Sequence, residues 1–185
     1  MIIAPTAIAG VHLIDPEPHH DARGFFARMF DDTAFAAAGL ATHFTQMNNS
    51  LSHQQATLRG LHYQLPPSAE VKLLRCVRGA LRDIALDLRP GAGFGQWIAA
   101  ELTADNRRMI YLPHGVAHGF ITLTDDTEAL YLTTAAHDPA RERGIRWNDP
   151  RFRINWARPP ASISDKDRTW PDFDPAFHGV GAFAR

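Results

Sequence analysis

The sequence has few of the features that mark secreted, membrane-bound or nucleic-acid-binding proteins. Cys76 is the only cysteine in 185 residues, so no disulfide can form within the chain, and we expect a reducing, cytoplasmic environment. The formal net charge of −1 gives no general attraction to nucleic acid or anionic membranes. No apolar run approaches the roughly eighteen residues that cross a bilayer, and the N-terminus lacks the pattern of a signal peptide. We therefore expect neither a membrane nor a nucleic acid as partner.

Familiar cofactor and metal motifs are also missing. The chain has no Walker loop and no dinucleotide fingerprint. A site that binds a metal through histidines on a strand usually has two of them separated by one residue. Here Gln64 stands where the second would follow His62. We therefore expect no tight metal site. A divalent ion held by His62, His118 and Glu70 stays open as an alternative.

The residues that are present favour β-structure. The segment 82–89 alternates with a period of two, with isoleucine and leucine on one face and Asp83 and Asp87 on the other. Carboxylates on the second face suit a strand that borders a polar cavity. The segment 72–78 ends at Gly79-Ala80, which predicts a tight turn into the next strand. Further strands are expected at 96–102, 109–112, 119–123 and 128–134.

This pattern predicts an all-β, mainly antiparallel sandwich or barrel. Many short strands at near-regular spacing are typical of that class. One helix is expected at about 32–38, between an Asp/Thr start and Gly39. After Trp147 the chain is rich in proline, aspartate and arginine. We expect a single domain over 1–185, with the segment from about 147 wrapping over the barrel.

The most informative string is Arg59-Gly60-Leu61-His62-Tyr63-Gln64, followed by Lys72. Imidazole is the side chain best suited to move a proton near neutral pH. A nearby ammonium such as that of Lys72 can hold the negative charge left when the proton leaves carbon. The pair indicates proton abstraction beside a carbonyl.

Other polar residues could complete such a site. His118 follows a Pro-Gly turn, and Tyr131 could donate a proton opposite a base. A carboxylate from 164–167 could orient the Nδ1 of a histidine and favour its charged form. Arg23 and Arg59 could clamp phosphates, because a guanidinium matches phosphate oxygens with two donors. The polar segment 46–50 suits hydrogen bonds to a base or sugar.

Taken together, these strings resemble the dTDP-4-dehydrorhamnose 3,5-epimerase family. The matches follow the family's order from near residue 20 to near residue 170. They are Asp21-x-Arg23-Gly24-Phe25-Phe26, Gln46-x-Asn48-x-Ser50, Arg59-Gly60-Leu61-His62-Tyr63-Gln64, Lys72-Leu73, Pro113-x-Gly115-x-Ala117-His118-Gly119-Phe120, Gly144-Ile145-x-Trp147-Asn148-Asp149-Pro150 and Ser164-x-Lys166-Asp167.

The resemblance implies a cupin-type jelly-roll barrel with a few short peripheral helices, which works as a homodimer without metal or redox cofactor. It also implies an isomerase that inverts C3 and C5 of a dTDP-linked 4-keto-6-deoxy sugar in deoxysugar biosynthesis. By the same resemblance His62 is the general base supported by Asp167, Tyr131 is the general acid, and Lys72 stabilises the enolate. The residues implied around the substrate are Arg23, Phe26, Gln46, Asn48, Arg59, His118 and Glu142.

Two departures from the family pattern bear on specificity. Arg28 stands where many members carry an acidic residue, and Ala136-His137 replaces a pair of tyrosines. An epimerase acting at one carbon only, at C3 or C5 of a related 4-keto sugar, therefore remains an alternative. Two others are a metal-dependent cupin oxygenase and a sugar-binding barrel without catalytic activity.

Overall fold

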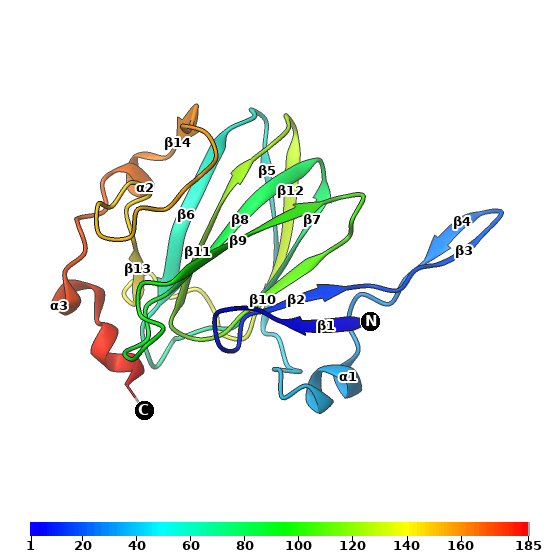
Figure 1. Cartoon of the computed structure of the whole chain (residues 1–185), viewed down its shortest axis with the longest axis horizontal. Coiled ribbons are helices and arrows are strands. Elements are labelled where there is room, and N and C mark those ends of the chain that lie inside the picture. The colour runs from blue at the N-terminus through cyan, green and yellow to red at the C-terminus, as the bar shows by residue number, and fades with distance from the viewer. Residues whose placement is uncertain (185) are drawn as a thin grey trace.

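Two antiparallel sheets face each other in the computed structural model, which describes residues 1–184 (Figure 1). The first sheet has the order β1 (Ile2–Pro5), β2 (His12–Asp15), β10 (Met109–Leu112), β7 (Lys72–Arg78), β12 (Thr127–Thr133) and β5 (Gln46–Ser52). The second has the order β13 (Glu142–Gly144), β6 (Thr57–Gln64), β11 (Val116–Thr122), β8 (Ala80–Asp87) and β9 (Trp97–Thr103), with β14 (Ser162–Ile163) parallel to β6. The all-β, mainly antiparallel prediction is confirmed.

The main core lies between the sheets. Leu74 and Ile110 of the first sheet pack in one cluster with Leu81, Leu102 and Phe120 of the second. All five are at most 5% exposed, and each fully buried side chain of this size stabilises a fold by about 2 kcal/mol. The apolar face predicted for 82–89, with Ile84, Leu86 and Leu88, is buried instead in a second cluster outside the second sheet.

The outer faces of both sheets are covered by other segments. The helix α1 (Asp32–Ala37) buries Phe35 completely against the outside of the first sheet, beside Leu73 and Tyr111. The C-terminal segment packs Phe152 and Trp156 against the outside of the second sheet. This segment also contains the short helices α2 (Asp165–Arg168) and α3 (Pro175–His178) and the 3₁₀ helix η1 (Val180–Phe183).

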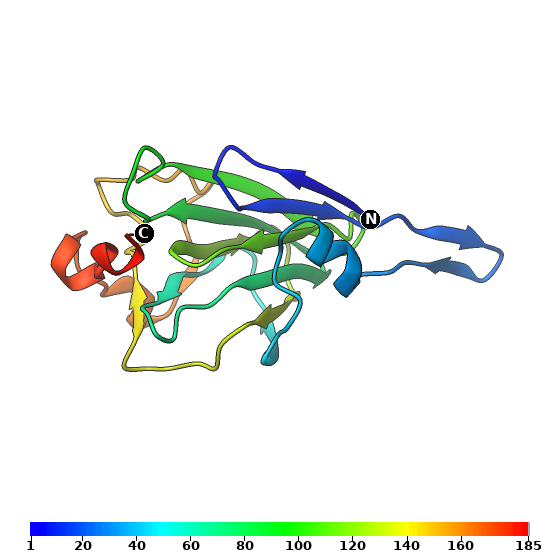
Figure 2. The same cartoon turned by 90° about the horizontal axis from the view of Figure 1, so that it is seen from below.

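A two-stranded hairpin, β3 (His19–Asp21) and β4 (Gly24–Phe26), stands apart from the barrel. Every residue of its two strands is exposed. Both views show it projecting beyond the sheets, on the side opposite the C-terminal segment (Figures 1 and 2). Within residues 1–184, no helix has the length and apolar character needed to cross a membrane.

Strands β6 and β11 bring two histidines side by side. His62 and His118 are direct partners in the antiparallel register. The strands approach closely here because glycines face each other: a Cβ on Gly60 would lie 2.5 Å from the Cα of Gly119. Gly60 also has a backbone φ of +115°, a conformation that residues with a Cβ rarely adopt.

Candidate active site

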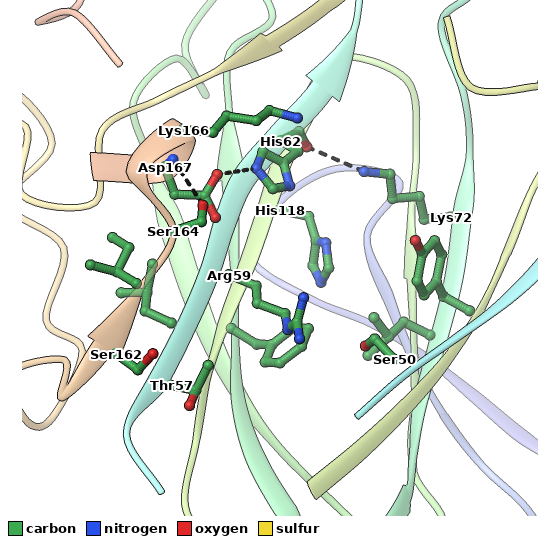
Figure 3. A pocket seen from close by; sticks show the side chains of 15 residues that line it. Ser50, Thr57, Arg59, His62, Lys72, His118, Ser162, Ser164, Lys166 and Asp167 are labelled. Carbon is green, nitrogen blue, oxygen red and sulfur yellow. Dashed lines mark hydrogen bonds and ion pairs between the residues drawn. The ribbon is translucent and has the colours of Figure 1, made fainter. Parts of the chain in front are cut away.

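A cavity of about 480 Å³ opens between the sheets (Figure 3). It contains six of the side chains singled out from the sequence, drawn from both sheets and from α2. They are Arg59, His62, Lys72, His118, Tyr131 and Asp167. The remaining lining residues are Ser50, Thr57, Leu58, Leu74, Phe120, Ser162, Ile163, Ser164 and Lys166.

His62 and Asp167 form a hydrogen-bonded pair at one wall of the cavity. The Nε2 atom of His62 lies 2.5 Å from Oδ1 of Asp167, although 105 residues separate them in sequence. The Oδ2 atom of Asp167 accepts a hydrogen bond from the Gly60 N–H at 3.1 Å. The Ser164 hydroxyl caps α2 by accepting from the Asp167 N–H. Both carboxylate oxygens of Asp167 are thus fixed by partners.

The nitrogen that Asp167 contacts differs from the sequence expectation. The prediction was that a carboxylate from 164–167 would orient Nδ1, and this is wrong because Asp167 reaches Nε2. The α2 segment approaches β6 beside the Gly60 N–H, and from there the nearer ring nitrogen is Nε2. Among the described residues Nδ1 of His62 has no hydrogen-bond partner, so it is the nitrogen available to a ligand.

The environment of Asp167 keeps its carboxyl ionised. Burial alone would raise the pKa of this carboxyl, since it is 3% exposed. The hydrogen bond and charge of His62, together with the Gly60 N–H, outweigh burial and leave the pKa below its usual value. A carboxylate in this state stabilises a positive charge on the imidazole.

Lys72 enters the cavity from the first residue of β7. Its ammonium lies 3.1 Å from Oε1 of Glu70 and donates to the carbonyl of His62 at 3.3 Å. The side chains of Lys72 and Glu70 are only 12% and 9% exposed. The cation is therefore largely removed from water and fixed next to the His62–Asp167 pair (Figure 3).

Tyr131 lines the same cavity from the opposite sheet. It belongs to β12, whereas His62 belongs to β6. Burial is the main cause that raises the pKa of the Tyr131 hydroxyl, and the negative charge of Glu70 adds to it, while Arg59 acts in the opposite direction. The phenol therefore keeps its proton at neutral pH.

His118 has a carboxylate partner of its own. Its Nε2 lies 2.7 Å from Oδ2 of Asp83, which is fully buried. Burial raises the pKa of the Asp83 carboxyl, and the neighbouring His118 counteracts part of this effect. The expectation that Asp83 borders a polar cavity fits this contact. Asp87 instead pairs with Arg89, at 2.7 Å.

Arg59 lines the cavity, whereas Glu142 is not one of its lining residues. The Arg59 guanidinium donates to the Ser52 hydroxyl and the Leu51 carbonyl, which hold it against β5. Glu142 accepts from Lys166 at 2.6 Å and lies 3.3 Å from His137. Burial would raise the pKa of the Glu142 carboxyl, but Lys166 and His137 lower it overall.

Five predicted substrate-binding residues do not line the cavity of their own chain: Glu142, described above, and four others. Gln46 and Asn48 lie on β5, where Asn48 is the register partner of Tyr131 and Gln46 accepts from the His137 N–H. Arg23 and Phe26 lie on the projecting hairpin. The Arg23 side chain is 90% exposed and Phe26 is 64% exposed. Within residues 1–184, Arg23 binds only Asp21 of the same hairpin.

Several lining residues were not singled out from the sequence. Lys166 and Ser164 lie in the same quoted string as Asp167, and Phe120 ends the string of His118. Membership of these strings was the signal that could have identified them. Thr57, Ser162 and Ile163 had no such signal, because the parallel contact of β14 with β6 depends on how the C-terminal segment folds back.

The residues considered for a metal do not come together as a ligand set. Within residues 1–184, no group of three or more His, Cys, Asp and Glu side chains is arranged to hold a metal ion. His62 and His118 each bind a different carboxylate, and Glu70 is engaged by Lys72.

Comparison with known proteins adds a consistent result. The sequence model described as dTDP-4-dehydrorhamnose 3,5-epimerase matches residues 5–175. The enzyme of that name from Sinorhizobium fredii is 42% identical over 173 residues, covering 92% of this chain and 89% of the relative. The Mycobacterium tuberculosis rmlC epimerase superposes with a TM-score of 0.91 at 34% identity, covering 100% of this chain and 94% of that one. ChmJ, a 3′-monoepimerase from Streptomyces bikiniensis in complex with dTDP-quinovose, has a TM-score of 0.88 at 32% identity, with coverage of 96% and 91%.

Proposed function

Because this chain belongs to the dTDP-4-dehydrorhamnose 3,5-epimerase family, we propose that it inverts C3 and C5 of a dTDP-linked 4-keto-6-deoxyhexose, as an isomerase of dTDP-rhamnose biosynthesis. The observation that carries the proposal is the placement of the His62–Asp167 pair and Tyr131 on opposite walls of one cavity that also contains Lys72. Family membership supplies the substrate class, and the cavity supplies the groups that the reaction needs.

His62 acts as the general base in this proposal. A proton on carbon next to a ketone is weakly acidic, and a positioned base speeds its removal by on the order of 10² to 10⁴. Asp167 stabilises the imidazolium that forms, because its carboxyl stays ionised beside His62. The Nδ1 atom of His62 takes the proton, since Nε2 is engaged by Asp167.

Lys72 and Tyr131 complete the reaction. The negative charge of the enolate collects on the oxygen at C4, and the Lys72 ammonium holds it there; a single aimed donor of this kind contributes about 3 to 4 kcal/mol. Tyr131 then protonates the carbon from the face opposite His62, which inverts the centre. Once His62 has released its proton to solvent and Tyr131 has regained one, the same cycle at the second carbon beside the ketone inverts that centre too.

Solvent exchange tests the reaction directly. In deuterium oxide, proton NMR of a dTDP-4-keto-6-deoxyhexose incubated with the protein is expected to show deuterium at both C3 and C5. His62→Ala should stop exchange at both carbons, because one base serves both. His53→Ala is the matched control, since His53 is 82% exposed and pairs with Asp126 outside the cavity.

The other outcomes separate the alternatives. Deuterium at one carbon only identifies a single-site epimerase, an option that the fold itself allows, since ChmJ is a 3′-monoepimerase. Binding of the sugar nucleotide without exchange at any carbon identifies a sugar-binding barrel and contradicts the proposal. Exchange that stops after chelation and returns with a divalent metal identifies a metal-dependent enzyme.

A homodimer would give Arg23 and Phe26, which lie on the projecting hairpin, a role in substrate binding. Arg23 offers a guanidinium and Phe26 an aromatic face, the groups that bind a diphosphate and stack on a base. Both project on an exposed hairpin away from their own cavity. We place them at the cavity of a second copy, where they bind the nucleotide together with Arg59, Gln46 and Asn48. His118 and Glu142 then line the sugar side.

The setting of the protein follows from the same assignment. We place the reaction in the cytoplasm, in keeping with a single buried thiol that forms no disulfide. We treat residues 1–185 as one domain, since both sheets contribute to one core.

A further inference from the structure

Glu70 is a buried carboxylate that the proposed reaction does not use. It stands in the loop between β6 and β7, and its side chain is 9% exposed. An ionised carboxylate in such a place is costly unless each oxygen has a partner. Oε1 lies 3.1 Å from the Lys72 ammonium, and Oε2 accepts from the Gln64 amide at 2.9 Å. Each oxygen therefore has one partner: an ion-paired ammonium for Oε1 and a donating amide for Oε2.

Gln64 holds this carboxylate from behind. It is 3% exposed, and its Nε2 also donates to the carbonyls of Ser68 and Ala136. Its Oε1 accepts from the Asp138 N–H at 2.6 Å. Because both ends of the amide are engaged, the donor that faces Glu70 cannot turn away.

The loop that carries Glu70 is fixed on both sides. The Val71 N–H donates to the Thr134 hydroxyl at 2.9 Å, and the Ser68 hydroxyl donates to Asp138 at 2.7 Å. The position of the Glu70 carboxylate is thus set by contacts with the segment after β12. A group that is held so firmly can in turn fix the long, flexible side chain of Lys72.

We propose that Glu70, held by Gln64, is a positioning residue that fixes the Lys72 ammonium where the enolate oxygen develops. The inference rests on the proposed epimerase reaction and deepens it. A lysine side chain has several rotatable bonds, and a donor stabilises an oxyanion well only when it is aimed before the reaction. The carbonyl of His62 accepts one N–H of Lys72, and the carboxylate of Glu70 holds the ammonium by an ion pair, so the ammonium is fixed and can still donate to the substrate.

The same carboxylate acts on the proposed acid. Its negative charge is the second cause, after burial, that raises the pKa of Tyr131. The other charged or titratable groups around this cavity are Arg59 and His62 from β6, Lys72 from β7, His118 from β11, Glu142 from β13, and Lys166 and Asp167 from α2. Removing the charge of Glu70 should therefore move the alkaline limb of the kcat profile to lower pH.

A double-mutant cycle with Lys72 tests the positioning role. Glu70→Ala should lower kcat about 10-fold with little change in KM, less than the 10² to 10³ expected when an oxyanion donor is itself removed. In the Lys72→Ala background the same change should alter the residual exchange rate by less than about 2-fold, because nothing remains to be positioned. Equal factors in both backgrounds would overturn the proposal.

A second variant keeps the test decisive if Glu70→Ala does not fold. Glu70→Gln keeps the shape but offers one oxygen to two donors, so it should also lower kcat several-fold, and only where Lys72 is present. Glu128→Gln is the matched control: Glu128 lies on β12 and binds Asn49 outside the cavity, so its kcat should stay within about 2-fold of the parent.

The two proposals fail in different ways. A parent protein that exchanges no deuterium contradicts the epimerase reaction and, with it, this role of Glu70. A parent that exchanges normally, with Glu70→Gln unchanged in kcat and in its alkaline limb, contradicts the role of Glu70 alone.

Discussion

The carboxyl of Asp167 balances two opposing effects at the scale of a single residue. Its burial favours the neutral acid, and its contacts with His62 and Gly60 favour the anion. The contacts win, so the folded protein binds the proton of this group more weakly than the unfolded chain does. The stability that this difference provides is complete above the ordinary carboxyl pKa of about 3.9 and is lost as the pH falls through the lower folded value.

Asp167→Asn should reveal this contribution. At pH 7 the variant should be less stable by about 2 kcal/mol, the usual worth of a hydrogen bond to a charged group, and its kcat should fall by 10² or more. The difference in melting temperature between variant and parent should shrink below about pH 4, because the unfolded chain takes up the proton first and the folded parent follows only at lower pH. Thermal unfolding between pH 3 and pH 8 measures it.

Asp165→Asn provides the control for that series. Asp165 belongs to the same short helix, but its side chain is 99% exposed. Its melting temperature should follow that of the parent at every pH. A constant deficit for Asp167→Asn down to pH 3 would show that the loss comes from packing rather than from charge.

The sequence predicted which residues belong to the site better than it predicted the contacts between them. The assignment of His62, Lys72 and Tyr131 to one cavity follows from residue type, strand register and the family strings. Glu70 was considered only as a metal ligand, since spacing along a sequence does not reveal which side chain a carboxylate will pair with. The sequence likewise could not show which nitrogen of His62 contacts Asp167, because the two residues are 105 positions apart and the contact depends on how the C-terminal segment folds back.

At the scale of elements, α2 is a single helical turn that carries a proposed catalytic residue. Asp167 is its third residue, and the Ser164 hydroxyl caps it through the Asp167 N–H. One capping bond therefore supports both the helix and the placement of the carboxylate. Four residues form too short a helix to be stable without such support.

Ser164→Ala should therefore weaken stability and catalysis together. We expect a loss of about 1 kcal/mol, or roughly 2 to 4 °C in melting temperature, with a several-fold fall in kcat. Asp174→Ala removes the equivalent cap from α3, where the Asp174 carboxylate accepts from the Ala176 N–H. It should cost similar stability but leave kcat unchanged. Equal effects of both variants on kcat would show that α2 has no special role.

Strands with buried apolar faces could be predicted well. The bounds expected for 72–78 and 109–112 are those observed for β7 and β10. The strand β5 was not predicted, because its alternation is the reverse of the usual one: the polar residues Asn48, Ser50 and Ser52 are partly or fully buried, while Met47 and Leu51 are exposed. The strand β3 was not predicted either, because its three residues are all polar and exposed.

At the scale of the whole molecule, two groups of predicted site residues lie far apart within one chain, one in the barrel and one on the hairpin. The barrel contains the reacting groups, while the hairpin carries Arg23 and Phe26 away from them. In a dimer that exchanges hairpins, each active site combines residues from two chains. Such a site can be rebuilt from two defective copies when their defects lie on different parts.

Mixed dimers test this arrangement. Co-expression of His62→Ala with Arg23→Ala should restore about a quarter of the parent activity, because half the dimers are mixed and each has one intact site. Each variant alone should be nearly inactive in deuterium exchange at low substrate concentration.

Mixing His62→Ala with Lys72→Ala is the control for that experiment. Both changes then lie in the barrel, so no mixed dimer contains an intact site and no activity should return. Failure of the first mixture to recover, with dimers present by light scattering, would place Arg23 outside the neighbouring site.

The position of α2 near the end of the chain also affects when the site is completed during synthesis. The last strand of the antiparallel sheets ends at Gly144, whereas Asp167 and its capping Ser164 follow some twenty residues later. During synthesis the ribosome can therefore release nearly the whole barrel, with His62 already in its strand, before the carboxylate emerges. A chain that ends before α2 lacks both the cover of the second sheet and the carboxylate that supports His62, so activity itself reports that translation has passed α2.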